Sequence, residues 1–520
     1  MRGNKCLGGW TRGIALLGFS LLLAFKAHAA PVFGKEYTLY QPDGAPVQVR
    51  IWGDEFYQHI ESLDGYTLIP DPRTREICYA KPTADRSDIE STGLRVGAKG
   101  LLKLGITPHI RPARKVIEAQ VAEARASIAG PLKSAGGPKA APTTGPVAGI
   151  CIIVDFSDSP GTITRTEVNN FCNQEGYTGY GNNGSVRDYY LSVSGNLLNY
   201  TNYVHTFSGP GGYFRAPKPK SYYDDPSVPQ GTRAVELITA ALNAMNGTVN
   251  FAQYDGDGDG YVDAVNCFYA GYRTSEWATG LWPHQGGMTW HADGVTVNAY
   301  QITDMSDELT IATFCHENGH LVMDWPDLYD YDFDSNGVGN FCLMGYGGAE
   351  KNPVQPCAPL KIQANWGTTV NLIGGQNGLS STAGSNVFYR FDNPNNAAES
   401  FLVENRQTTG RDASLPDSGL AIWHVDTDGS NDWNEQLPTR HYLVTLVQAD
   451  GEWHLEHDMN YGDANDLWGT PYKSAFGATS NPNSNWWSGM PSDFELSNIS
   501  APGATMTFDF TQPNLQVLPV

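Results

Sequence analysis

The stretch CHENGHLVMDWPDLYD, from Cys315 to Asp330, holds two histidines four residues apart and a glutamate directly after the first of them. Residues four apart lie on one face of an α-helix, so His316 and His320 can present their imidazoles to one metal ion. Glu317 is offset around the same helix. Because a pattern of three residues also arises by chance in long chains, its surroundings must decide what it means.

A zinc ion that takes part in catalysis is held by three protein ligands and keeps its fourth position for water. Zinc lowers the pKa of such a water to about 7. Glu317 would accept the water's proton during attack on a peptide carbonyl and later pass it to the leaving amine. The pattern therefore predicts metal-assisted peptide hydrolysis and requires a third protein ligand.

The third ligand can come from either of two places. A chain that turns sharply after the helix would supply it from the acidic segment that follows His320. That segment contains Asp324, Asp327, Asp330, Asp332 and Asp334. A ligand from a separate downstream helix would instead be Glu350. The crowding of aspartates favours the first geometry.

A methionine follows in the glycine-containing turn Leu343-Met344-Gly345. Met344 could lie beneath the metal ion in that turn. The alternative is ordinary packing in the core, which is the commoner role of methionine.

The chain of 520 residues exceeds the usual size of a single domain, so we expect a multidomain protein. Its strand and helix patterns predict the α+β class. Short alternating apolar runs separated by Asp-Gly and Pro turns predict β-rich regions at both ends. The apolar run 147–156 predicts a buried strand in a central region of sheet and helices. The expected regions are a signal peptide at 1–30, a β-rich N-terminal pro-region at 31–115, a flexible linker at 116–147 that begins as a short helix, a catalytic α/β domain at 148–368 and a β-sandwich-like domain at 369–520.

Residues 1–30 have the features of a secretory signal peptide. Arg2, Lys5 and Arg12 accompany the apolar run GIALLGFSLLLAF, and Ala27-His28-Ala29 has the small-x-small pattern of a cleavage site. We therefore expect a secreted protein whose mature chain begins near position 30, with a retained anchor as the alternative. No later stretch approaches twenty apolar residues, so we expect no stable membrane insertion.

The net charge of −22 argues against a nucleic-acid partner, because phosphate binding needs basic patches. The many carboxylates of this acidic chain instead favour the binding of calcium. Alternate positions of one glycine-rich loop carry acidic side chains, namely Asp255, Asp257, Asp259 and Asp263. The loop lacks the glutamate that closes an EF-hand at its twelfth position, so it predicts a calcium loop of another type. The alternative is an acidic surface turn.

The cysteines predict disulfides, because an exported domain favours them. Six cysteines fall in the central region and could form three disulfides. They are Cys151, Cys172, Cys267, Cys315, Cys342 and Cys357. Cys315 and Cys342 flank the metal helix and the methionine turn, which favours that pair. Cys78 is then unpaired, and its thiolate could bind the zinc and hold a precursor latent until the linker is cut. A spare thiol is the alternative.

The motifs HENGH and PDLYD, followed by CLMGYG and preceded by DGDGDGYVDAV, resemble those of the immune inhibitor A family of secreted metzincin-type zinc peptidases. The segment GSVRDYYLSVSGNLLN from Gly184 also resembles that family, as does RIWGDEFYQHIESLDGYT from Arg50. The C-terminal region adds FLVENRQ from Phe401, LPDSGLAIWHVD from Leu415 and VQADG from Val447. Together these segments span most of residues 45–510. The resemblance implies a metzincin-like catalytic domain.

One departure from the family concerns the turn after the helix. The family helix is followed by a glycine and then Leu-Pro-Asp, whereas this chain is one residue longer and has Met323 where the glycine would stand. Alignment on Pro-Asp-Leu-Tyr-Asp makes Asp327 the leading third ligand and Asp330 its rival. The resemblance also implies that Tyr346 could assist oxyanion stabilisation, with packing as the alternative role.

We therefore expect a secreted zinc endopeptidase that is made as a precursor and also binds structural calcium. Its partners would be protein or peptide substrates and an activating protease. One alternative is a secreted adhesin or carbohydrate-binding protein with a structural or degenerate metal site, although a purely structural zinc would not need Glu317. The other is a zinc amidase that acts on cell-wall peptides.

Overall fold

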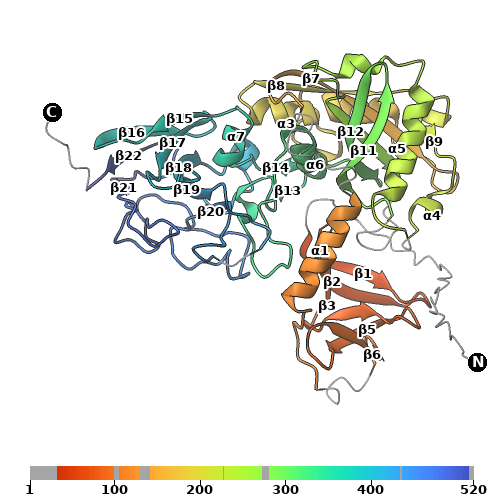
Figure 1. The fold of residues 1–520 in the computed structure, drawn as a ribbon, viewed down its shortest axis with the longest axis horizontal. Helices are drawn as coiled ribbons and strands as arrows, with labels where there is room; N and C mark the ends of the chain where they lie inside the picture. Colours follow the sequence, from red (N-terminus) through yellow and green to blue (C-terminus); the bar gives the residue numbers. More distant parts are fainter. Residues whose placement is uncertain are drawn as a thin grey trace, which may run out of the picture.

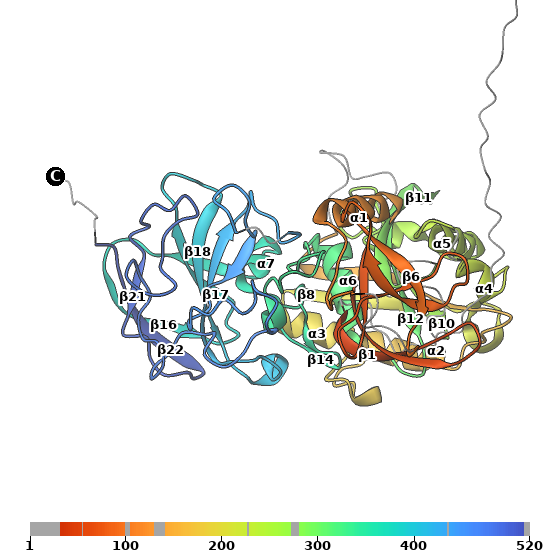
Figure 2. The ribbon, with the colours of Figure 1, turned by 90° about the horizontal axis from the view of Figure 1, so that it is seen from below.

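The computed structural model describes residues 32–54, 56–98, 105–128, 141–225, 228–271, 280–433 and 436–513. The protein is a mixture of helices and several β-sheets with a multidomain appearance. An N-terminal unit lies against a central region of sheet and helices, below it in Figure 1, and a C-terminal β region extends to the left. A view turned by 90° shows the same separation of the C-terminal β region from the rest (Figure 2).

The N-terminal unit consists of two three-stranded antiparallel sheets and one helix. Its elements are β1 (Val32–Tyr40), β2 (Pro46–Gly53), β3 (Gln58–Ser62), β4 (Leu68–Pro70), β5 (Ile77–Pro82), β6 (Ile89–Arg95) and α1 (Arg114–Ile128). Apolar side chains of both sheets, such as Val49 and Ile77, share one hydrophobic cluster. Trp282 of the central region is buried in the same cluster, so the unit is packed onto the rest of the chain.

The central sheet has the strand order β11-β12-β10-β7-β8, and β9 pairs with β7 beyond the end of β8. Its strands are β7 (Gly145–Asp155), β8 (Leu198–Val204), β9 (Phe214–Arg215), β10 (Ala264–Ala270), β11 (His284–Ala292) and β12 (Val295–Met305). The pairings are parallel except at the edge, where β11 runs antiparallel to β12.

Helices cover both faces of this sheet, which explains why β7 is apolar almost throughout. Cys151 and Ile153 of β7 join the cluster that contains α2 (Arg165–Asn173), α3 (Val186–Val193) and α6 (Ile311–Met323). Ile150 and Ile152 face the opposite side, where α5 (Thr232–Met245) packs. The short helix α4 (Lys220–Tyr223) lies beside α5. The strand expected at 147–156 is thereby confirmed.

The C-terminal region contains a five-stranded and a three-stranded sheet that share one hydrophobic cluster. The strands are β15 (Thr368–Asn371), β16 (Gln376–Thr382), β17 (Val387–Asp392), β18 (Glu399–Arg406), β19 (Gly419–Asp426), β20 (Val444–Leu446), β21 (Glu495–Ser497) and β22 (Thr505–Thr511). The other faces of β18 and β19 join the core of the central region through Leu402 and Trp423. The hairpin β13 (Gly348–Ala349) and β14 (Asn352–Pro353) and the helix α7 (Ala358–Gln363) lie between the two regions in sequence.

The segment expected as a flexible linker is ordered at both of its described ends. The helix expected at its start is α1, which ends at Ile128, and β7 already begins at Gly145. The Gly/Pro-rich stretch 129–140 and the signal peptide at 1–30 lie outside the described residues. Within the described part of the chain, no helix is long and apolar enough to cross a membrane.

The prediction of three disulfides is wrong for this structure. All seven cysteines in the described ranges are free thiols, and each is buried. Cys315 and Cys342 do not form the expected pair; the Cys342 sulfur instead accepts a hydrogen bond from the backbone N–H of Cys357 at 3.3 Å. The physical reason is that the six central cysteines pack as small apolar side chains in the cores on the two faces of the sheet.

Candidate metal centre

The helix that carries the histidines is almost entirely buried. It starts at Ile311, and Thr310 is its N-cap residue. Asn318, which costs helix propensity, is held by hydrogen bonds with Asn266 at 3.0 Å and with the Tyr200 hydroxyl at 2.7 Å. No local sequence pattern predicts this buried polar network, since its members are far apart in the chain.

Gly319 explains how the methionine turn fits beneath the helix. A Cβ atom at Gly319 would lie 2.7 Å from the Met344 sulfur and 3.1 Å from the Trp325 ring. Met344 is fully buried against this point. The glycine of the HENGH motif therefore permits the close approach of Met344 to the helix between the two histidine turns.

The helix ends in a sharp turn at Asp324. Met323 is the last helical residue, and Asp324 adopts the left-handed conformation with φ 55° and ψ 35°. Aspartate tolerates this conformation better than most residues with a side chain. The backbone N–H of Trp325 reaches back to the carbonyl of Gly319 at 3.1 Å, which closes the helix end. The turn then directs Asp327 back toward the histidines.

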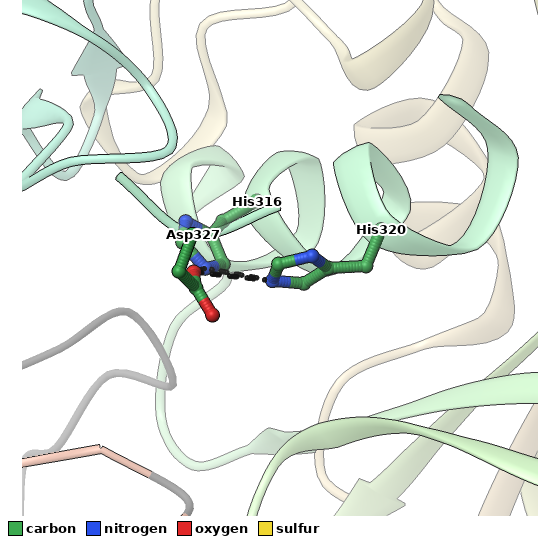
Figure 3. A group of neighbouring side chains, drawn as sticks. All are labelled: His316, His320 and Asp327. Atoms are coloured by element: carbon green, nitrogen blue, oxygen red, sulfur yellow. Dashed lines mark hydrogen bonds and ion pairs between the residues drawn. The ribbon is translucent and has the colours of Figure 1, made fainter. Parts of the chain in front are cut away.

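Three side chains converge beside the helix, as Figure 3 shows. His316 Nε2 lies 3.1 Å from Asp327 Oδ1, His320 Nε2 lies 3.3 Å from the same oxygen, and the two Nε2 atoms are 3.2 Å apart. Ligand atoms bonded to one tetrahedral zinc ion at about 2.0–2.1 Å are about 3.3–3.4 Å from one another. The nearly equilateral triangle of two imidazole nitrogens and a carboxylate oxygen therefore fits one zinc ion.

In each of the same three side chains, an atom on the side away from the metal position lies within hydrogen-bonding distance of a neighbouring group. His316 Nδ1 lies 3.2 Å from the carbonyl of Leu343, and His320 Nδ1 lies 2.7 Å from the carbonyl of Trp325. Donation from Nδ1 to a carbonyl leaves each Nε2 as an acceptor that faces the metal position. The Tyr331 hydroxyl donates to Asp327 Oδ2 at 2.8 Å, so Tyr331 orients the carboxylate. Sequence reasoning missed this tyrosine because nothing in the motif distinguishes it.

We expect Tyr331→Phe to weaken zinc binding by about 10–100-fold, as is usual when a group that orients a metal ligand is removed. The aromatic packing of residue 331 is preserved in this variant. Zinc affinity is measured by competition with a chromogenic chelator. The control is Tyr189→Phe, which removes a buried hydroxyl bonded to the carbonyl of Val354 at 2.8 Å. Equal zinc affinities in both variants would show that Tyr331 does not orient a ligand.

Glu317 is fully buried, yet neither of its carboxylate oxygens has a hydrogen-bond partner among the described residues. Burial raises the pKa of this carboxyl above its usual range. The carboxyl group lies close to the backbone of Gln285 in the edge strand β11. A buried carboxylate without a partner is costly for stability, so it is typical of a group retained for chemistry.

Other residues that the sequence singled out lie elsewhere. Asp330, the rival third ligand, accepts hydrogen bonds from the backbone N–H of Asp332 at 3.0 Å and from the Ser335 hydroxyl at 2.7 Å, and it is not part of the triangle. The Tyr346 hydroxyl donates to the Asn336 side chain. Glu350 lies in the turn between β13 and β14.

The predicted calcium loop brings three of its four acidic side chains together, and Asp263 is not part of that group. Asp255, Asp257 and Asp259 each offer an oxygen within 4.8 Å of the others. Asp263 is 7% exposed, and its Oδ1 accepts the backbone N–H of Gly256 at 3.1 Å, whereas its Oδ2 has no hydrogen-bond partner within the described ranges. Burial raises the pKa of Asp263 to about 6. The oxygen-only donor set fits calcium.

The N-terminal unit lies over the loop that carries Asp327. The ring of Tyr331 contacts Phe56 edge-on at 5.3 Å between ring centres, and the Arg125 guanidinium of α1 lies 4.3 Å from the centre of the same ring. Arg125 also pairs with Asp432 at 3.0 Å. Burial raises the pKa of Asp54, just after β2, to about 7, and the negative charge of nearby Asp327 adds to this shift.

The hypothesis that Cys78 binds the zinc is wrong for this structure. Cys78 lies in β5, where it is fully buried beside Ser91. Burial raises the pKa of its thiol, which disfavours the thiolate that a metal would need. Among the described residues, the histidine-containing group at the helix includes only His316, His320 and Asp327.

The chain matches no known protein-family model, and a comparison with curated proteins finds no significant match.

Proposed function

We propose that this protein is a secreted zinc-dependent endopeptidase of the metzincin type, related to the immune inhibitor A family. The observation that supports this function most strongly is the triangle of His316, His320 and Asp327, with sides of 3.1–3.3 Å, on the helix that also carries Glu317. The central sheet, with its antiparallel edge strand β11 beside that helix, agrees with a metzincin-like domain. The two C-terminal sheets agree with a β-sandwich.

Bound zinc would supply a Lewis acid that polarises a substrate carbonyl and activates water. The role of Glu317 is to take a proton from the attacking water and to deliver it to the amine that leaves. Its raised pKa suits this task, because a carboxyl group that is too acidic would hold the proton poorly. His316 and His320, fixed by backbone carbonyls, keep their Nε2 atoms toward the metal position.

The direct test is hydrolysis of casein by the purified, zinc-loaded protein, with isolated peptidoglycan as a parallel substrate. A zinc endopeptidase cleaves casein and loses that activity when a chelator removes the metal. Cleavage of peptidoglycan alone would favour a cell-wall amidase. Stoichiometric zinc without hydrolysis of either substrate would favour an adhesin with a structural metal site.

The contacts of the N-terminal unit support synthesis as a precursor. Phe56, Arg125 and Tyr331 pack together over the loop that carries Asp327, and Trp282 is buried in the core of the N-terminal unit. A unit held by such contacts restricts the approach of a protein substrate to the metal centre.

We therefore expect cleavage within residues 129–140 and release of residues 31–128 to increase kcat/KM for casein. Limited proteolysis followed by gel filtration separates the two forms for assay. The intact chain incubated without protease is the control. If the cleaved enzyme without its N-terminal unit is no more active than the intact chain, the unit is not inhibitory.

A further inference from the structure

A second acidic group follows the metal-site loop directly. Asp330, Asp332 and Asp334 each offer a carboxylate oxygen within 4.8 Å of the other two. Asp330 is fully buried and Asp332 is 4% exposed, whereas Asp334 is exposed. Burying carboxylates so close together costs free energy unless their charge is balanced.

The hydrogen bonds of this group leave one buried oxygen without a partner. Both oxygens of Asp330 accept hydrogen bonds, one from the Asp332 backbone and one from Ser335. Asp332 Oδ2 lies 3.8 Å from Arg114 Nε. Asp332 Oδ1 has no hydrogen-bond partner in the part of the chain that the structure describes. A buried carboxylate oxygen in this position favours cation binding, because native proteins rarely leave such atoms unpaired.

We propose that Asp330, Asp332 and Asp334 form a calcium site, separate from the loop at 255–263 and from the zinc centre. The group offers only oxygen donors, which are the ligands that calcium prefers, whereas zinc favours nitrogen and sulfur. A calcium ion bound here balances the charge of the three carboxylates and fixes the loop that begins at the zinc ligand Asp327.

Two arginines of the N-terminal unit contact the same loop. Arg111 Nη1 donates to the backbone carbonyls of Asp332 at 2.6 Å and Phe333 at 2.5 Å. Arg114 pairs with the Asp332 carboxylate. In the intact chain the two guanidinium groups balance part of the negative charge of the three aspartates. Their positive charge also repels a calcium ion at the site. Calcium binding is therefore stronger when the arginines are absent.

The experiment measures calcium bound per full-length chain by equilibrium dialysis and elemental analysis, and calcium affinity by titration calorimetry. The test variant is Asp334→Asn, because Asp334 is the exposed member and its substitution leaves the buried packing in place. The matched control is Asp257→Asn in the other acidic loop. Neither measurement depends on peptidase activity.

We expect Asp334→Asn to bind one calcium ion fewer than the unmodified chain, or to bind it at least about tenfold more weakly, because the charge of the ligands sets the affinity. The loss adds to that of Asp257→Asn in the double variant. Arg114→Gln strengthens binding at the site. Unchanged calcium number and affinity in Asp334→Asn would overturn the proposed site. Unchanged calcium affinity in Arg114→Gln would show that the N-terminal unit does not weaken calcium binding there.

Discussion

The variant Glu317→Gln is expected to hydrolyse casein about 10²–10⁴-fold more slowly than the unmodified enzyme, because general acid–base catalysis contributes a factor of that size. Zinc binding should persist, since Glu317 is not one of the three converging side chains. Stability should not fall. The native carboxylate is fully buried without a hydrogen-bond partner within the described ranges, so a neutral amide removes a burial cost.

Three measurements check this prediction together: the rate of casein cleavage, zinc content and the thermal midpoint. The control is Glu308→Gln, which changes a partly exposed glutamate that pairs with Lys351 at 2.8 Å, shortly before the helix. It should keep full activity. A Glu317→Gln variant that retains zinc and cleaves casein at the unmodified rate would exclude Glu317 as the base.

The second large effect is expected for Asp327→Asn, which replaces the charged oxygen ligand by a neutral amide of the same shape. Loss of a group that only orients a ligand typically costs about 10–100-fold in metal affinity. Loss of the ligand charge itself should therefore weaken zinc binding by more than about 100-fold, with activity lost in parallel. Chelator competition measures the affinity, and restoring activity with excess zinc separates metal loss from unfolding.

Asp330→Asn is the matched control, because Asp330 is also buried and lies three residues further along the same loop. Its carboxylate is bonded to the Asp332 backbone and Ser335, outside the histidine triangle. Zinc affinity should therefore fall much less in Asp330→Asn than in Asp327→Asn. A larger loss of zinc in Asp330→Asn than in Asp327→Asn would reverse the assignment of the third ligand.

The sequence was informative where the determinants are local. The four-residue spacing of the histidines, the apolar run of β7 and the acidic loop after Tyr254 all depend on residues close together in the chain. The structure bears out the helix, the strand and the proximity of the carboxylates. The preference for Asp327 over Asp330 also agrees with the geometry, although the preference came from an alignment and the geometry depends on the left-handed turn at Asp324.

The determinants that the sequence could not reveal are contacts between distant segments. Tyr331 orients Asp327 only because the loop folds back, and Asn318 finds Tyr200 and Asn266 only across the sheet. The cysteine prediction failed for the same reason. An exported chain favours disulfides in general, but pairing depends on where the fold places each sulfur atom. Here the sulfur atoms are buried as free thiols in the described structure.

The most direct test of the central proposal is zinc analysis of the purified protein together with X-ray absorption at the zinc edge. The proposed centre predicts one zinc ion per chain, bound only by nitrogen and oxygen at about 2.0–2.1 Å, with scattering from two imidazole rings. Both imidazole signals should disappear in His316→Ala together with tight zinc binding. Absence of stoichiometric zinc, or sulfur ligands at about 2.3 Å, would contradict a centre built from His316, His320 and Asp327.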